Sequence, residues 1–145
     1  MHARRREIAA SDARIGKLLV ALLFLYGLAS LVHFTHNAEF LREYPNMPSG
    51  LSRWQIYIAW VAVTAIGIGG CVLWSRGHAI LGLCVIAAYA ALGFDGLAHY
   101  ALAPFAAHSA PMHLTIWLEV VAAAGLFAAA LGRMAKLAFP KGRNS

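Results

Sequence analysis

The 145-residue chain has few charged residues and few cysteines, and both shortages exclude classes of protein. Charged residues make up 12% of the chain, against roughly 25% in typical globular proteins. The two cysteines, Cys71 and Cys84, form no Cys-x-x-Cys pair, which excludes the common redox and haem-attachment motifs. His-Glu-x-x-His is also absent, as is any adjacent His-His pair. The sequence is therefore neither that of an ordinary soluble domain nor that of a protein with a strongly diagnostic metal motif.

Long apolar runs are what the chain has instead. Apolar residues make up 61% of the chain, and most of them fall in long runs that none of the five prolines interrupts. A membrane span needs about 20 mostly apolar residues. The sequence therefore predicts an all-α fold, a four-transmembrane-helix bundle that forms a single membrane domain over residues 1–145. The predicted spans are residues 15–36, 54–74, 79–102 and 113–132.

The placement of basic residues predicts the orientation of these helices. Ten of the twelve lysines and arginines flank the same side of the predicted bundle, and Arg42 and Arg53 lie on the other. By the positive-inside rule, both termini are cytoplasmic, as in a protein of the bacterial inner (plasma) membrane. The net charge of +6 favours contact with anionic membrane lipids, and no nucleic-acid motif accompanies it. A secretory signal also begins with basic and apolar segments, but no clear small-x-small cleavage site follows here.

Titratable residues gather near the predicted outer ends of the spans. His33 and His36 close the first apolar run, and Asp95 and His99 close the third. These pairs are three and four residues apart, so each pair should share a helix face. His113 begins the fourth run, and Glu119 lies six residues deeper, about 9 Å along the axis. Ionisable groups in apolar spans are costly, which makes this end of the bundle the candidate functional site.

The leading hypothesis is an outward-facing metal site that serves an enzyme acting on a lipophilic substrate. Imidazole and carboxylate suit zinc, iron or copper, and helical bundles often build such sites from facing side chains. The predicted metal ligands are His33, His36, His99 and His113, and the predicted catalytic carboxyls are Asp95 and Glu119. We expect His33, His99 and His113 to surround one ion. Glu119 should turn away from His113.

Four other functions fit the same residues. Haem b can use His33 and His99 as axial ligands from different helices. Metal-free isomerisation can use Asp95, Glu119 and a histidine to move protons, and contact of Glu119 with Asp95 or His33 would favour this chemistry. The titratable groups can also line a metal or proton transport path. Lastly, these polar groups can bind another membrane protein, if the chain is an assembly subunit of a membrane complex.

Two further features give local predictions. His108 lies in the second outer loop, where we expect it to be exposed to solvent. Small residues four apart in the second and fourth spans are predicted to let helices approach closely, within the bundle or in a homo-oligomer. These small residues are Ala65 and Gly69 in the second span and Ala124, Ala128 and Gly132 in the fourth.

Overall fold

The structure is a computed structural model that describes the backbone of residues 2–139 and the side chains of residues 16–139. It is all-helical, and the described part of the chain contains no strand. The elements in chain order are α1 (His2–Glu39), α2 (Arg53–Ser75), α3 (Ala79–Leu92), the 3₁₀ turn η1 (Gly93–Leu97), α4 (Ala98–Leu102), the 3₁₀ turn η2 (Phe105–Ala107) and α5 (Ala110–Ala138). α3, η1 and α4 follow one another without a loop, so the chain forms four long rods, as the sequence predicted.

Local signals place the ends of the helices. Pro45 and Pro48 follow α1 in the connection to α2, where they stop helix growth. Ser52 caps α2, and its side chain and that of Gln55 form a reciprocal capping box. Between α2 and α3, Gly77 adopts a φ of 89°, which a residue with a side chain rarely adopts.

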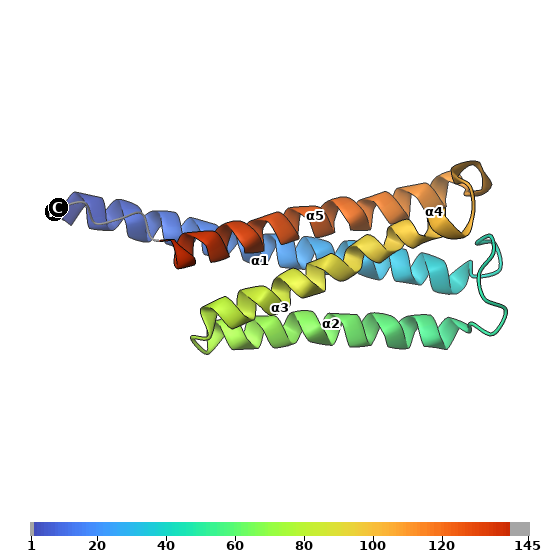
Figure 1. Cartoon of the computed structure of the whole chain (residues 1–145), viewed down its shortest axis with the longest axis horizontal. Helices are drawn as coiled ribbons and strands as arrows, with labels where there is room; N and C mark the ends of the chain where they lie inside the picture. Colours follow the sequence, from blue (N-terminus) through green and yellow to red (C-terminus); the bar gives the residue numbers. More distant parts are fainter. Residues whose placement is uncertain (1, 140–145) are drawn as a thin grey trace.

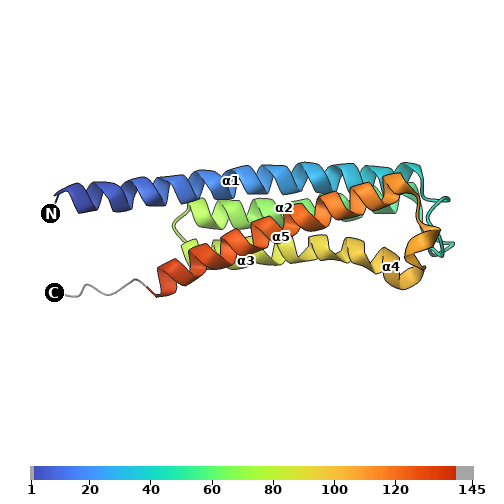
Figure 2. The ribbon, with the colours of Figure 1, turned by 90° about the horizontal axis from the view of Figure 1, so that it is seen from above.

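The rods lie side by side along the long axis of the molecule (Figures 1 and 2). The α1–α2 connection and the α4–α5 connection meet at one end, which we call the two-loop end; the tight α2–α3 turn marks the opposite, turn end. α1 packs most closely on α5, and α2 packs most closely on α3. The apolar core includes Tyr26, whose ring lies 4.6 Å from that of Tyr89.

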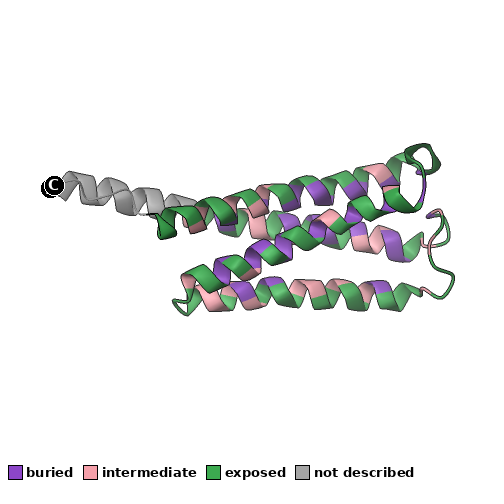
Figure 3. Ribbon diagram, viewed as in Figure 1, coloured by how far each residue is buried: buried purple, intermediate pink, exposed green. Residues whose placement is uncertain are grey.

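Large apolar side chains cover the outside of the bundle as well as its core. Exposed positions occur along the length of the rods in Figure 3, and Phe24, Leu114 and Val121 are 76%, 69% and 65% exposed. All four rods contain a segment long and apolar enough to cross a membrane. Extensive exposed apolar surface is unfavourable in water and favourable against lipid tails. The chain thus has the fold of an integral membrane protein in contact with lipid.

Some predicted details of the helices are wrong. α1 begins at His2 and ends at Glu39, beyond both predicted limits, and α5 begins at Ala110. The predicted small-residue ridges do not lie in the bundle interior, since a Cβ added at Gly69 or Gly132 would meet nothing within 4 Å. Close helix approach occurs instead where Gly67 and Gly70 of α2 face α3. The reason is rotational: a residue spacing of four fixes which residues share a face, but not where that face points.

Candidate functional site

A histidine and a carboxyl group meet inside the bundle near the two-loop end. His33 of α1 and Glu119 of α5 are each 2% exposed, and His33 Nε2 lies 3.6 Å from Glu119 Oε2. Gly96 of η1 lies beside Glu119, and a Cβ there would be in ordinary van der Waals contact with Oε2 at 3.6 Å. A carboxylate buried among apolar helices must be paired or protonated. The 3.6 Å separation is just beyond hydrogen-bonding distance, and a small shift of either side chain would let His33 and Glu119 share a proton.

Asn37 connects this pair to a second histidine. Its side-chain Nδ2 donates to Nε2 of His33 at 3.0 Å and to Nε2 of His99 at 3.3 Å. In this arrangement each imidazole accepts at Nε2, which places the proton of a neutral ring on Nδ1; Nδ1 of His33 is buried and has no hydrogen-bond partner. If His33 Nε2 gains a proton, it must donate to Glu119 and can no longer accept from Asn37. The hydrogen bonds of Asn37 thus depend on where the shared proton lies.

These groups line a cavity of about 250 Å³ between α1, α2, α3, η1, α4 and α5; most of its lining is apolar, and we call it the polar cavity after the titratable groups that border it. Its polar lining includes His33, Asn37, Asp95, His99 and Glu119. Aliphatic side chains from the α1–α2 connection and neighbouring helices complete it, among them Met47, Leu51 and Leu102. Most of the polar residues predicted for the site therefore border one small cavity.

Asp95 and His99 both reach this cavity, but not from one continuous helix face. The sequence predicted an unbroken helix over residues 79–102, whereas residues 93–97 form the 3₁₀ turn η1. Tighter winding in η1 changes the angle between the two side chains. Asp95 is consequently exposed and His99 is buried. Mid-helix 3₁₀ segments often mark functional sites, and here η1 brings Gly96 beside Glu119.

His113 belongs to a separate group of aromatic side chains, which we call the rim cluster: Tyr100, Phe105, His108 and His113. His113 Nδ1 hydrogen-bonds the Tyr100 hydroxyl at 2.8 Å, and its ring stacks on Phe105 with centroids 3.8 Å apart. His108 is 7% exposed and its Nδ1 lies 3.1 Å from the Pro104 carbonyl oxygen, so the prediction of a solvent-exposed His108 is wrong. The short η2 turn folds this residue back onto the bundle.

His36 is held by Tyr44 instead of lining the cavity. Its Nδ1 lies 2.8 Å from the Tyr44 hydroxyl, and Tyr44 also stacks near His99, with ring centroids 4.8 Å apart. Burial raises the pKa of Tyr44 to about 12, although a hydrogen bond with Thr115 acts in the opposite direction. Tyr44 is therefore a neutral phenol near pH 7 and can donate to His36. No role was predicted for Tyr44, because it lies in a connection between helices.

The predicted three-histidine metal centre is not supported by this geometry. Within residues 16–139, no three His, Cys, Asp or Glu side chains are grouped so that they can hold one metal ion. His33 and His99 converge on Asn37, whereas His113 turns to Tyr100. The separation follows from the position of His113 in the first turn of α5, almost two helical turns from the level of Glu119. Cys71 and Cys84 are free and do not border the polar cavity.

Sequence reasoning missed Asn37, the residue that connects the two buried histidines. We expected the first helix to end near His36, although residues 38–44 could continue it, and this left Asn37 at the start of a loop. Its position four residues after His33 puts both on one face once the helix continues to Glu39. The signal was therefore present, but it depended on the helix boundary.

Comparison with protein-family models, with curated proteins and with solved structures finds no match for this chain.

Proposed function

We propose that this chain is a membrane enzyme that moves a proton on a lipophilic substrate, with His33 and Glu119 as its acid–base pair. The observation that carries the proposal is the 3.6 Å approach of His33 Nε2 to Glu119 Oε2. Both side chains are buried, and both line the polar cavity. General acid–base catalysis needs a proton acceptor and a proton donor held close to one reacting group.

The simplest reaction that such a pair supports is a double-bond isomerisation. The pair removes a proton from a substrate carbon beside a carbonyl group or double bond. The electron pair left by the broken C–H bond moves into the neighbouring π system, and the double bond shifts. The pair then returns a proton at the far end of that system. No oxidant or reductant is consumed, and the net charge of site and substrate is unchanged.

His99 and Asp95 extend this proton-transfer site in different ways. His99 shares the Asn37 amide with His33, so a change of protonation at one imidazole alters the hydrogen bonds available to the other. Asp95 lies on the exposed side of the cavity, where it can accept a hydrogen bond from a substrate hydroxyl or exchange protons with water. We assign proton transfer to His33 and Glu119, and substrate positioning to His99 and Asp95.

Metal binding is the second candidate function, and one observation favours it. Nε2 of His33 and Nε2 of His99 both point at the Asn37 amide nitrogen, as two ligands point at a shared ion. Zinc, iron or copper bound there would have two imidazole ligands, and within residues 16–139 no third His, Cys, Asp or Glu side chain is placed to complete the centre without moving. A haem b held by His33 and His99 uses the same nitrogens. Both versions require Asn37 to move away.

We further propose that the protein lies in a bacterial inner (plasma) membrane, with both termini in the cytoplasm and the polar cavity near the outer surface. The distribution of lysine and arginine supports this orientation. In the structure, Arg76 lies at the turn end, while Arg42 and Arg53 lie at the two-loop end. A substrate would then reach the cavity from the outer leaflet of the membrane.

Deuterium transfer tests the function even while the substrate is unidentified. Purified protein is incubated in D₂O with the membrane lipids that co-purify with it, and the lipids are analysed by mass spectrometry. An enzyme that adds solvent-derived protons to carbon leaves deuterium that survives washing with H₂O. We expect such incorporation into one lipid species with the native chain, and its loss in Glu119→Gln and in His33→Gln.

Glu39→Gln is the matched control, because Glu39 is an exposed carboxylate on the helix that carries His33. It pairs with Tyr57 and Arg53, and it does not line the cavity. This variant should retain incorporation. Unchanged incorporation after treatment with a chelator supports the metal-free reaction, and its loss supports the metal-bound one. Incorporation that persists in both Glu119→Gln and His33→Gln would overturn the assignment of the pair.

A further inference from the structure

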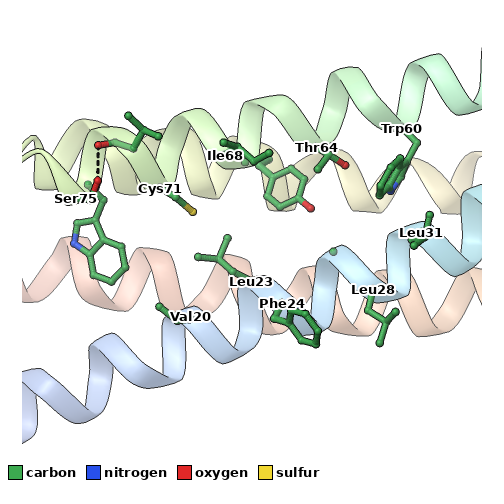
Figure 4. Close-up of a pocket in the computed structure, with 15 residues that line it drawn as sticks. Val20, Leu23, Phe24, Leu28, Leu31, Trp60, Thr64, Ile68, Cys71 and Ser75 are labelled. Carbon is green, nitrogen blue, oxygen red and sulfur yellow. Dashed lines mark hydrogen bonds between the residues drawn. The ribbon is translucent and has the colours of Figure 1, made fainter.

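An apolar groove of about 760 Å³ runs between α1 and α2 in the half of the bundle nearer the turn end. Figure 4 shows α1 and α2 on either side of this groove, with Leu23 and Leu31 of α1 pointing toward the helix that carries Trp60, Thr64 and Ile68. Phe24 and Leu28 of α1 also line it. Several of its residues are exposed, including Leu28 at 50% and Ile68 at 60%. In a membrane, the groove is therefore open at its side to the lipid tails.

The floor of the groove depends on a close approach of α2 and α3. Gly67 of α2 lies against the ring of Tyr89, and a Cβ at Gly67 would lie 2.8 Å from that ring. Gly27 of α1 also faces Tyr89, whose hydroxyl would lie 3.7 Å from an added Cβ. Both glycines line the groove, so the absence of their side chains deepens it.

This groove and the polar cavity are neighbours along α1 and α2, although no residue lines both. On α1, Leu31 borders the groove, and His33 and Phe34 border the cavity; on α2, Trp60 borders the groove, and Ala59 borders the cavity. Less than one helical turn separates the two linings on either helix. The titratable groups of the cavity therefore lie just beyond one end of the apolar groove, at the next level along α1 and α2.

We infer that the substrate is a single-tailed amphiphile whose polar head enters the cavity and whose tail lies in the groove. This inference rests on the proposed function, because it takes the cavity as the place of reaction. A cavity of about 250 Å³ is below the usual range of about 300–1,000 Å³ for complete ligand sites. The head alone fits there. From Trp60 to Ser75 the groove extends about 22 Å at 1.5 Å per residue, which suits a long extended tail.

The geometry favours a lipid tail over a partner helix in this groove. A helix with its side chains is about 10–12 Å across and would rest on the rim, without reaching the titratable groups. A single tail can follow the groove and keep its head joined to the cavity. The open side also lets a tail enter directly from the bilayer.

Photolabelling of the full chain in phosphatidylcholine nanodiscs tests the inference. The probe is a long-chain fatty alcohol that carries a photoreactive diazirine near the end of its tail, and labelled peptides are mapped by mass spectrometry. We expect saturable labelling of α1 and α2 along the groove. Unlabelled long-chain alcohol should compete, whereas short-chain alcohol should not.

Leu28→Trp and Leu25→Trp form a matched pair of variants. Both positions are on α1 and are about equally exposed, at 50% and 48%, but only Leu28 lines the groove. We expect Leu28→Trp to weaken saturable labelling about tenfold, the effect of losing about 1.4 kcal/mol of binding free energy. Leu25→Trp should be labelled by the probe to the same extent as the native chain. Ile68→Trp, on the opposite wall, should repeat the effect of Leu28→Trp.

The outcomes separate this inference from the proposed function. Unsaturable labelling that includes the Leu25 face shows bulk lipid only and overturns the inference, as does equal labelling of Leu28→Trp and Leu25→Trp. Probe-independent crosslinks between two copies through the groove also overturn it. Glu119→Gln should bind the probe normally while it fails to incorporate deuterium. Deuterium incorporation that is unaffected by Leu28→Trp and Ile68→Trp would leave the proposed function standing and reject the groove.

Discussion

Among the uncharged polar residues of this site, Asn37 is the one whose replacement should lower stability most, because its side-chain amide nitrogen hydrogen-bonds two buried imidazoles. We predict that Asn37→Leu lowers the free energy of unfolding by about 1–3 kcal/mol, since it leaves buried acceptors on His33 and His99 without a donor. Thermal unfolding in detergent measures the change. Asn46→Gly is the control. It removes an exposed hydrogen bond from the Asn46 side-chain amide to the Leu102 carbonyl, and glycine tolerates the positive φ of 58° at this position. Equal stability of Asn37→Leu and Asn46→Gly would contradict the prediction.

Tyr44 gives a prediction that depends on pH. Burial raises its pKa to about 12, so this phenol should stay neutral about two pH units above the pKa of about 10 that tyrosine has in water. The difference between the tyrosinate absorbance of the native chain and that of Tyr44→Phe should rise near pH 12. Because the unfolded chain loses this proton first, the contribution of Tyr44 to stability declines as pH rises from 10 to 12. A difference curve with its midpoint near pH 10 would show that Tyr44 is accessible to water.

At the scale of helices, the apolar runs predicted the rods well because a membrane span imposes a simple requirement of length and apolarity. The same runs contain little information about helix rotation. His113 and Glu119 were expected to point in different directions, and they do, but no pattern in the sequence indicated that Glu119 would face His33. That contact depends on how α5 packs against α1.

The 3₁₀ turn η1 was also missed, although two glycines border Asp95 in Gly93-Phe-Asp-Gly96. Glycine within a helical pattern weakens the expectation of regular helix. Here the structure shows a packing reason: a Cβ at Gly93 would lie 2.6 Å from the Tyr26 ring and 2.7 Å from Ala123. Contacts between distant segments decide this feature, so the spacing of Asp95 and His99 alone did not predict it.

The packing of α2 against α3 gives a prediction at this scale. A Cβ at Gly82 would lie 2.6 Å from the Trp74 backbone nitrogen, and backbone cannot move aside as a flexible side chain can. We predict that Gly82→Ala lowers the free energy of unfolding by about 1–3 kcal/mol through overpacking. Gly69→Ala is the matched control, since nothing lies within 4 Å of its added Cβ. It should gain up to about 1 kcal/mol of helix propensity. Thermal unfolding in detergent should shift in opposite directions for the two variants.

In the described fold, the site histidines and carboxyl groups lie near one end of the bundle, and several basic residues lie nearer the other. The polar cavity and the rim cluster lie near the two-loop end, where the ends of α1, α4 and the start of α5 meet (Figure 1). Lys17, Arg133 and Lys136 belong to the segments of α1 and α5 nearer the turn end. This separation connects orientation to function, because it decides which side of the membrane supplies protons and polar head groups to the cavity.

Reporter fusions test the orientation of the whole chain. An enzyme that is active only in the periplasm should be inactive when fused after Ser145 and active when inserted near Pro48, because ten of twelve basic residues favour a cytoplasmic location for both termini. A reporter that is active only in the cytoplasm, placed at the same two positions, is the control and should give the opposite pattern. If both reporters place Pro48 in the cytoplasm, the polar cavity opens to the inner leaflet. Its protons and substrate would then come from the cytoplasmic side, while the contact between His33 and Glu119 would be unchanged.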